Sequence, residues 1–226
     1  MGADLASQMA AMAARLADIC HSAGIAMGEA THTLLHADLG MAEHVIGGNE
    51  DMAAAVSDAE EAGVSLLSSA LRVSAAQEMV VIVGSMQIIA DLDRMGVLAR
   101  HVAKIARRRH PRKVLPEEVT DHFFQMGMIA VDLAERARQV IVSHDLGLAH
   151  YIRQADDAMD FHHRHLFTVL MEREWRHGTA AAVDVTLLGR YYERFADHAV
   201  EISRRVIFQV TGHSRSEERI LIPRLF

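Results

Sequence analysis

The segment that decides the fold is HADLGMA at residues 36–42, because it recurs as SHDLGLA at residues 143–149. These two copies are 107 residues apart in a chain of 226. A second matching pair, DRMG at 93–96 and ERFA at 193–196, is 100 residues apart. Self-similarity at a nearly fixed spacing is the signature of repeated structural units. The sequence therefore predicts two related halves, and the difference in spacing corresponds to about two helical turns in one hairpin.

Apolar residues recur at alternating spacings of four and three along most of the chain, which is the pattern of amphipathic helices. With only 3 Pro and 14 Gly, long helices can run without interruption. Such stripes predict antiparallel bundles with narrow crossing angles. The three clearest stripes are Leu5, Met9, Met12, Leu16, Ile19, Ala23 and Ala26; Val119, Phe123, Met126, Ala130, Leu133, Ala137 and Val140; and Val185, Leu188, Tyr192, Phe195, Ala199, Ile202 and Val206.

We expect an all-α protein built from two tandem, pseudo-symmetric three-helix bundles. The first bundle is predicted at 1–110, the second at 116–212, and a tail follows at 213–226. The helices are expected at 4–36, 41–70, 76–109, 116–143, 148–176 and 180–211, with Asp38 as an N-cap. The basic run RRRHPRK at 107–113 is interpreted as cations at a helix C-terminus followed by a solvated linker.

Charge and composition exclude several classes of protein. The 23 basic and 30 acidic residues give a net charge of -7, which argues against binding to a nucleic-acid backbone. Cys20 is the single cysteine, so an internal disulfide framework is excluded. We see neither a signal peptide nor an 18-residue apolar run, and we therefore expect a cytoplasmic protein. Nucleophile elbows, Gly-rich phosphate loops and CxxC motifs are missing too, and we expect no enzymatic activity.

Two acidic pairs in the second half carry the i, i+4 spacing that places both carboxylates on one helix face. They are Asp156 with Asp160, and Glu193 with Asp197. Like charges at this spacing repel, so solvent, an arginine or a cation must compensate them. If the two helices pack antiparallel, four carboxylates converge into an oxygen-rich site suited to iron, manganese or magnesium.

The residues around the second pair resemble a known family. GRYYERFADHAVEI at 189–202 resembles the last-helix signature of PhoU proteins, and DLDRMG at 91–96 is similar to the corresponding first-repeat motif. The resemblance covers about residues 5–212. Segments 101–111, 184–186 and 205–208 resemble the actinobacterial PhoY branch of the family.

The resemblance implies a function. Family members are twin three-helix bundles that act beside the phosphate-specific ABC transporter. They repress phosphate uptake and phosphate-starvation signalling through contacts with the transporter ATPase and a sensor histidine kinase. Some members bind iron or another metal, such as manganese, magnesium or zinc, on acidic motifs of each repeat. A protein of this kind reaches the membrane only through its partners.

Carried over by position, the metal motif is complete only in the second repeat, where Asp156, Asp160, Glu193 and Asp197 all match. In the first repeat Asp93 remains as a weak counterpart, while the other positions hold residues that cannot replace a carboxylate: Asn49, Ala53 and Val97. We therefore predict that any metal site lies in the second half, and that the first half serves packing and partner contact.

Two other functions remain open. A ferritin-like di-iron oxidoreductase would use Glu-x-x-His pairs such as Glu29 with His32 and Glu174 with His177, although these pairs lie in different repeats. A metal-free helical adaptor needs no such ligands. Among the 15 histidines, His162 occupies an apolar-stripe position, so we interpret it as structural rather than as a ligand.

The tail at 213–226 lies outside the repeat and ends in apolar residues, ILI at 220–222 and LF at 225–226. It is either a disordered end or a docking segment for a partner or a second copy of the chain. The sequence leaves the oligomeric state open, including a homodimer.

Overall fold

The computed structural model describes residues 2–72, 76–172 and 175–212, and the predicted tail at 213–226 lies outside them. The described residues form helices and connecting turns without any strand, which confirms the all-α prediction. The helices are α1 (Gly2–His36), α2 (Leu39–Gly47), α3 (Asn49–Arg72), α4 (Ala76–Arg109), α5 (Glu117–Ser143), α6 (Leu146–Met171) and α7 (Gly178–Thr211). None of these helices is long and apolar enough to cross a membrane.

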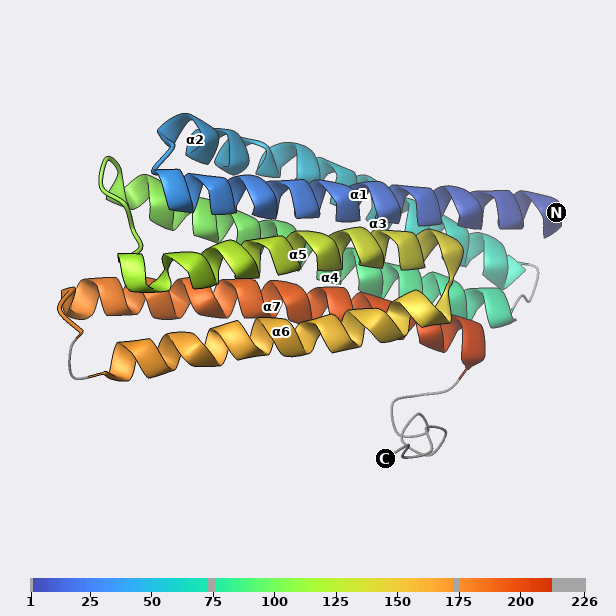
Figure 1. Cartoon of the computed structure of the whole chain (residues 1–226). Helices are drawn as coiled ribbons and strands as arrows, with labels where there is room; N and C mark the ends of the chain where they lie inside the picture. Colours follow the sequence, from blue (N-terminus) through green and yellow to red (C-terminus); the bar gives the residue numbers. More distant parts are fainter. Residues whose placement is uncertain (1, 73–75, 173–174, 213–226) are drawn as a thin grey trace, which may run out of the picture.

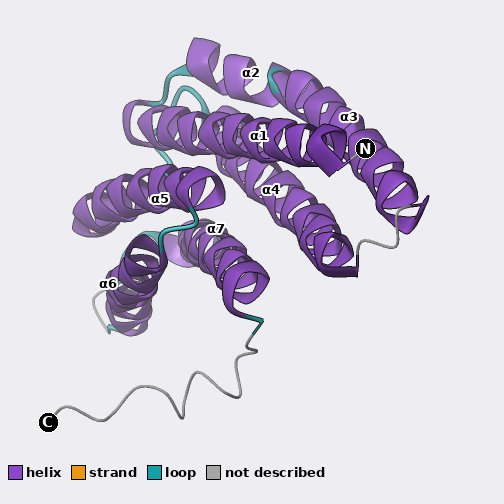
Figure 2. Cartoon of the chain, turned by 90° about the vertical axis from the view of Figure 1, so that its right-hand side faces the viewer, coloured by secondary structure: helices purple, strands orange, loops and turns teal. Residues whose placement is uncertain are grey.

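The helices lie roughly side by side along one direction (Figure 1). Seen from the end, α1 lies against α5 and α4 lies against α7, while α3 and α6 lie on the outer sides (Figure 2). One continuous apolar cluster runs through both halves, and Phe123, Tyr192 and Phe195 are its largest aromatic members. Because the halves share this core, the division at 110–116 into two domains stays a prediction.

Small residues let α1 and α5 approach closely. A β-carbon at Gly24 would lie 3.0 Å from Cβ of Ala134, and one at Gly28 would lie 3.3 Å from Val131. Further along α1, Thr31 packs against Gly127. Residue numbers rise on α1 while they fall on α5, so the two helices are antiparallel.

The repeated segment has the same backbone geometry in both halves. Each first helix ends in a left-handed residue, Ala37 with φ 55° or His144 with φ 56°. An aspartate then caps the next helix: Asp38 accepts from the Met41 amide, and Asp145 accepts from the Gly147 and Leu148 amides. Both aspartates therefore act as N-caps, which satisfy amides that the helix leaves unpaired.

The helix predicted at 41–70 is two helices, α2 and α3, so the first half contains four helices rather than three. The break falls at Gly47 and Gly48, where the Gly48 amide still donates to the His44 carbonyl at 2.8 Å. Two successive glycines weaken a helix because they lack side chains and lose more backbone entropy on folding. In the second half α6 is continuous but ends at Met171, earlier than predicted.

The interpretation of residues 107–113 as helix-end cations and a solvated linker is only half right. Arg108 and Arg109 bind the carboxylate of Asp184 on α7, with N···O distances of 2.7 Å and 2.6 Å. Asp184 is only 2% exposed. The basic run therefore fastens the end of α4 to the start of α7.

A second polar contact joins the same two helices. Asp91 of α4 lies 3.0 Å from Nδ1 of His198 and accepts from Nε of Arg205 at 2.8 Å, both on α7. Arg205 also contacts Glu201 at 3.3 Å. Each helix thus contributes a buried carboxylate, Asp91 or Asp184, that contacts an arginine of the other helix.

Candidate functional site

The four predicted carboxylates lie on two helices that pack together in the second half. Asp156 and Asp160 belong to α6, and Glu193 and Asp197 belong to α7. The two helices are in contact, as Figure 1 shows from the side. Each pair follows the i, i+4 rule, so its two carboxylates share one helix face.

The charges of carboxylates on one helix shift the pKa values of carboxylates on the other. Burial, followed by the charges of Asp160 and Asp197, raises the pKa of Asp156 to about 6. Burial and then the charge of Asp197 also raise the pKa of Glu193, with a smaller contribution from Asp160. Because each helix perturbs the other's carboxylates, we call these four residues the acidic cluster. The cluster gathers negative charge that nothing in it fully neutralises.

Arginines compensate part of this charge. Both carboxylate oxygens of Glu193 contact Nη1 of Arg190, one turn earlier on α7. Arg204 lowers the pKa of Asp156. Among the described residues, no three histidine, cysteine, aspartate or glutamate groups converge closely enough to hold an ion. A metal would therefore have to compete with Arg190 for Glu193 and draw the side chains together.

His163 is a member of the site that the sequence analysis missed. Its Nε2 atom is buried and has no hydrogen-bond partner among the residues that the structure describes. Asp160 and Asp197 act to raise its pKa, although burial and the charge of Arg190 outweigh them and lower it. An imidazole nitrogen that two carboxylates influence electrostatically is chemically suited to iron or zinc. Position 163 follows Asp156 by seven residues and Asp160 by three, which is a helical spacing, but only the packing of α6 on α7 shows that His163 lies at the site.

His162 points toward α5 instead. Its Nδ1 lies 3.0 Å from Nδ1 of His122, and the ring of His165 lies 4.3 Å from that of His122 between centroids. Burial lowers the pKa of His122 and of His162, and the charge of His165 acts in the same direction. His162 therefore belongs to the packing between α5 and α6, in keeping with its predicted structural role.

The described residues of the first repeat form no equivalent cluster. Asn49 begins α3 at the helix break, and Met52 covers Gly96 so closely that a β-carbon there would overlap its sulfur. Ala53 is exposed, and Asp93 is half-buried with no hydrogen bond or ion pair among the described residues. Asp91 faces α7, where it binds His198 and Arg205.

The Glu-x-x-His pairs lie apart. Glu29 is 3.7 Å from His44 of α2, and His177 is 2.9 Å from Glu118 of α5. Glu174 lies outside the described residues. The described contacts therefore give the di-iron alternative no support.

The raised pKa of Asp156 predicts a pH-dependent effect on stability. The unfolded pKa is near 3.8 and the folded one about 6, so the folded state binds more protons between these values and loses stability as the pH rises through them. With a chelator present to keep the protein free of metal, Asp156→Asn should raise the free energy of unfolding at pH 7.5 by about 1 kcal/mol, after allowance for solvent screening. Urea denaturation should show the gain disappearing near pH 4, and a gain that is the same at both pH values would contradict this origin.

Comparison with known proteins gives a consistent result. A family model described as "PhoU domain" matches residues 123–206. The chain is 58% identical over 205 residues to phosphate-specific transport system accessory protein PhoU homolog 2 of Mycobacterium tuberculosis, covering 91% of this chain and 95% of that one. It is 54% identical over 213 residues to PhoU homolog 1 of Mycobacterium leprae, covering 94% and 95%.

Solved structures agree on the fold. The crystal structure of PhoU from Pseudomonas aeruginosa superposes with a TM-score of 0.74 at 24% identity and covers 93% of this chain and 97% of that one. A second, the phosphate transport system regulatory protein PhoU from Streptococcus pneumoniae, gives 0.79 at 19% identity, with 92% and 98% covered. With more than half of all residues identical to mycobacterial relatives over nearly the whole length, the chain belongs to the PhoU family.

Proposed function

We propose that this protein is an accessory regulator of a phosphate-specific transport system, acting in the cytoplasm. It represses phosphate uptake and phosphate-starvation signalling by binding the transporter ATPase and a sensor histidine kinase. The observation that carries the proposal is 58% identity to an accessory protein of such a system, with 95% of that relative covered. The kinase and the ATPase as partners follow from the family resemblance of the signature at 189–202.

Deletion of the gene tests the regulatory role. We expect a phosphate-starvation reporter to become active in high phosphate and to be silenced again by the restored gene. Pull-downs with the tagged protein in high and low phosphate should recover the transporter ATPase and a histidine kinase, and the amounts should change with phosphate. A reporter that still responds normally to phosphate in the deletion strain would contradict the proposal.

The acidic cluster is proposed as a cation site of this regulator. Asp156, Asp160, Glu193 and Asp197 supply hard oxygen donors, and His163 adds a free ring nitrogen. A bound cation would neutralise their mutual repulsion and tie α6 to α7. With α6 and α7 held together in this way, their surface would be more rigid where a partner binds it.

Glu193→Ala combined with Asp197→Ala is expected to lower bound iron or manganese roughly tenfold or more, because half of the carboxylate donors are lost. Elemental analysis of the folded protein measures this. Asp93→Ala in the first repeat is the matched control and should leave the metal content unchanged. Arg190→Gln frees the Glu193 carboxylate, so it should hold at least as much metal as the unaltered protein. Equal metal content in all variants would exclude the site.

A metal-free adaptor is the second candidate, because the described side chains do not form a closed ligand set. Under that hypothesis the variant at residues 193 and 197 still represses the reporter fully. Catalysis is not part of either proposal, since PhoU relatives are named as accessory and regulatory proteins.

A further inference from the structure

Three histidines meet where α5 packs on α6, and none of them belongs to the acidic cluster. His122 lies near the start of α5, while His162 and His165 lie about one turn apart on α6. The Nδ1 atoms of His122 and His162 are 3.0 Å apart, and the rings of His122 and His165 lie 4.3 Å apart between centroids. We call these three residues the histidine cluster. Two helices thus bring three imidazole rings together at one place.

The contact between His122 and His162 has nearly the geometry of a metal site. Because the two Nδ1 atoms face each other, one ring must donate the shared proton and the other must accept it. Zinc binds imidazole nitrogens at about 2.0–2.1 Å in a tetrahedral arrangement, which places two ligand nitrogens about 3.3 Å apart. The observed 3.0 Å is close to this separation. A zinc ion can therefore replace the shared proton after a small outward shift of the rings.

His165 is placed to become the third ligand. It follows His162 by three residues, so both side chains leave α6 on the same face. No three such groups already converge on one point in the described residues, so binding requires the His165 ring to turn toward the pair. His165 is exposed, which gives its ring room to turn and leaves a fourth position open to water. The negative charge of Asp121 acts on the His122 ring and favours a cation at this place.

The ligand atoms distinguish the histidine cluster from the acidic cluster. Imidazole nitrogens suit zinc, copper and nickel, whereas carboxylate oxygens suit magnesium and manganese. The two clusters also join different helices, because the histidine cluster lies between α5 and α6 and the acidic cluster between α6 and α7. An ion in one cluster would therefore leave the ligands of the other in place.

We propose that His122, His162 and His165 form a site for zinc or a chemically similar transition-metal ion. The turn at 144–145 already joins α5 and α6 at one end (Figure 1). An ion bound by the histidine cluster fastens the same two helices again, toward the other end of the hairpin. Occupancy of the site then decides how firmly α6 is held against α5. This inference depends neither on the proposed regulatory role nor on a cation in the acidic cluster.

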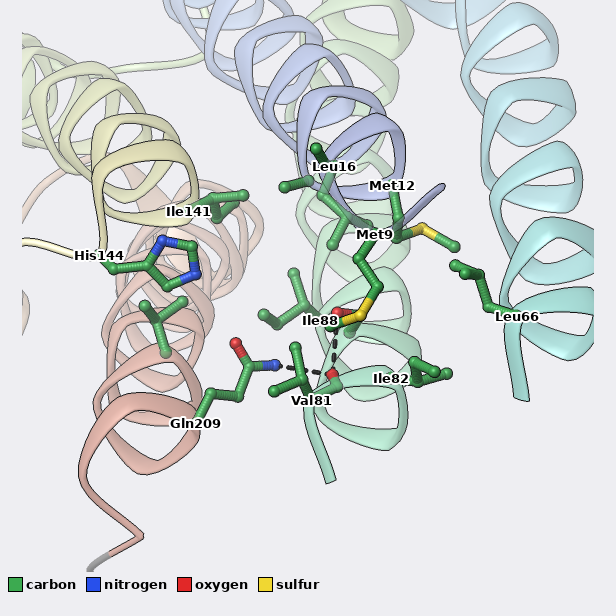
Figure 3. A pocket seen from close by; sticks show the side chains of 14 residues that line it. Met9, Met12, Leu16, Leu66, Val81, Ile82, Ile88, Ile141, His144 and Gln209 are labelled. Carbon is green, nitrogen blue, oxygen red and sulfur yellow. Dashed lines mark hydrogen bonds between the residues drawn. The ribbon is translucent and has the colours of Figure 1, made fainter. Parts of the chain in front are cut away.

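His144 supplies a matched control for this proposal. It follows the end of α5 and lines an apolar pocket together with Met9, Leu16 and Ile141, as Figure 3 shows. The described residues that line this pocket include no second histidine and no carboxylate, so His144 has no neighbour there with which to share an ion. Its backbone is left-handed with φ 56°, a conformation that asparagine tolerates. His144→Asn therefore removes a histidine without touching the histidine cluster.

Zinc titration of the metal-free protein tests the site. The chain with Glu193→Ala and Asp197→Ala serves as the background, because half of the carboxylates of the acidic cluster are then gone. Competition with a coloured chelator at pH 7.5 should show one tightly bound zinc ion per chain in this background. His122→Gln or His162→Gln should weaken binding roughly tenfold or more, because each removes a ligand nitrogen. His144→Asn should leave the affinity unchanged.

Cobalt(II) as a second probe reports the ligands directly, since its visible absorption depends on their number and kind. The His165→Gln variant should bind cobalt with a changed spectrum, whereas His144→Asn should reproduce the spectrum of the background. Circular dichroism checks that each variant is folded, and glutamine fills much of the space of the lost ring. The proposal is overturned if the glutamine variants at 122 and 162 bind zinc as tightly as the background. It is also overturned if the background binds no zinc, or if the cobalt spectrum does not respond to His165→Gln.

Discussion

Replacing Asp91 with alanine is expected to lower the free energy of unfolding by about 2–3 kcal/mol, because it leaves the partly buried Arg205 guanidinium and the His198 ring without their carboxylate partner. Asp91 is 8% exposed and contacts His198 at 3.0 Å and Arg205 at 2.8 Å. The side chains of His198 and Arg205 are only 18% and 25% exposed, so water cannot fully replace the lost contact. Urea denaturation followed by circular dichroism measures the loss.

Asp93→Ala is the matched control for this prediction. Asp93 lies on the same helix, half-buried, without a hydrogen bond or ion pair among the described residues. Its replacement should change stability by less than about 0.5 kcal/mol. The double variant of Asp91 and Arg205 should be less destabilised than the sum of the two single changes, which isolates their coupling. Equal effects of Asp91→Ala and Asp93→Ala would show that the contact does not support the interface.

Gly127→Ala is expected to destabilise the protein by about 2–3 kcal/mol, although the same change in an open helix adds stability. A β-carbon at position 127 would overlap the side chain of Thr31 on α1. Thr31 cannot move away easily, because its hydroxyl bonds the Met27 carbonyl at 2.8 Å and the Tyr192 hydroxyl at 2.7 Å. Burial raises the pKa of Tyr192, whose hydroxyl stays protonated and needs this partner.

Two further variants distinguish steric overlap from a general helix effect. Gly47→Ala, where a β-carbon meets nothing within 4 Å, should leave stability unchanged or raise it by up to about 1 kcal/mol. Thr31→Ala makes room for the new methyl group, so the double variant should recover part of the loss at Gly127. Additive losses from Thr31→Ala and Gly127→Ala in thermal unfolding would mean that the two helices are not in tight contact there.

Local patterns predicted much of the fold. The stripe of Val185, Leu188 and Tyr192 is buried as expected, since a helix buries residues three and four apart on one face. Asp38 caps α2 as predicted, because its short carboxylate accepts from the Met41 amide, one of the amides that a helix start leaves unpaired. The break at Gly48 was missed because glycine pairs weaken a helix without always ending it.

The acidic cluster was predictable only as two pairs. Spacing placed Asp156 with Asp160 and Glu193 with Asp197, but it carried no information on which face of α6 meets α7. His163 was missed for that reason, while His162, one residue away, packs on α5. One position along a helix turns a side chain by about 100°, so neighbouring histidines face different helices.

The sequence by itself determined that this chain is helical, repeated and a member of the PhoU family, because periodicity, capping residues and the signature at 189–202 are local properties. Tertiary structure alone decided how the halves meet. It matched Asp91 and Asp184 with cations on the opposite helix, and it brought Gly127 against Thr31. Such contacts join residues about 75 to 115 positions apart, and they depend on the rotation and offset of packed helices, which no local pattern specifies.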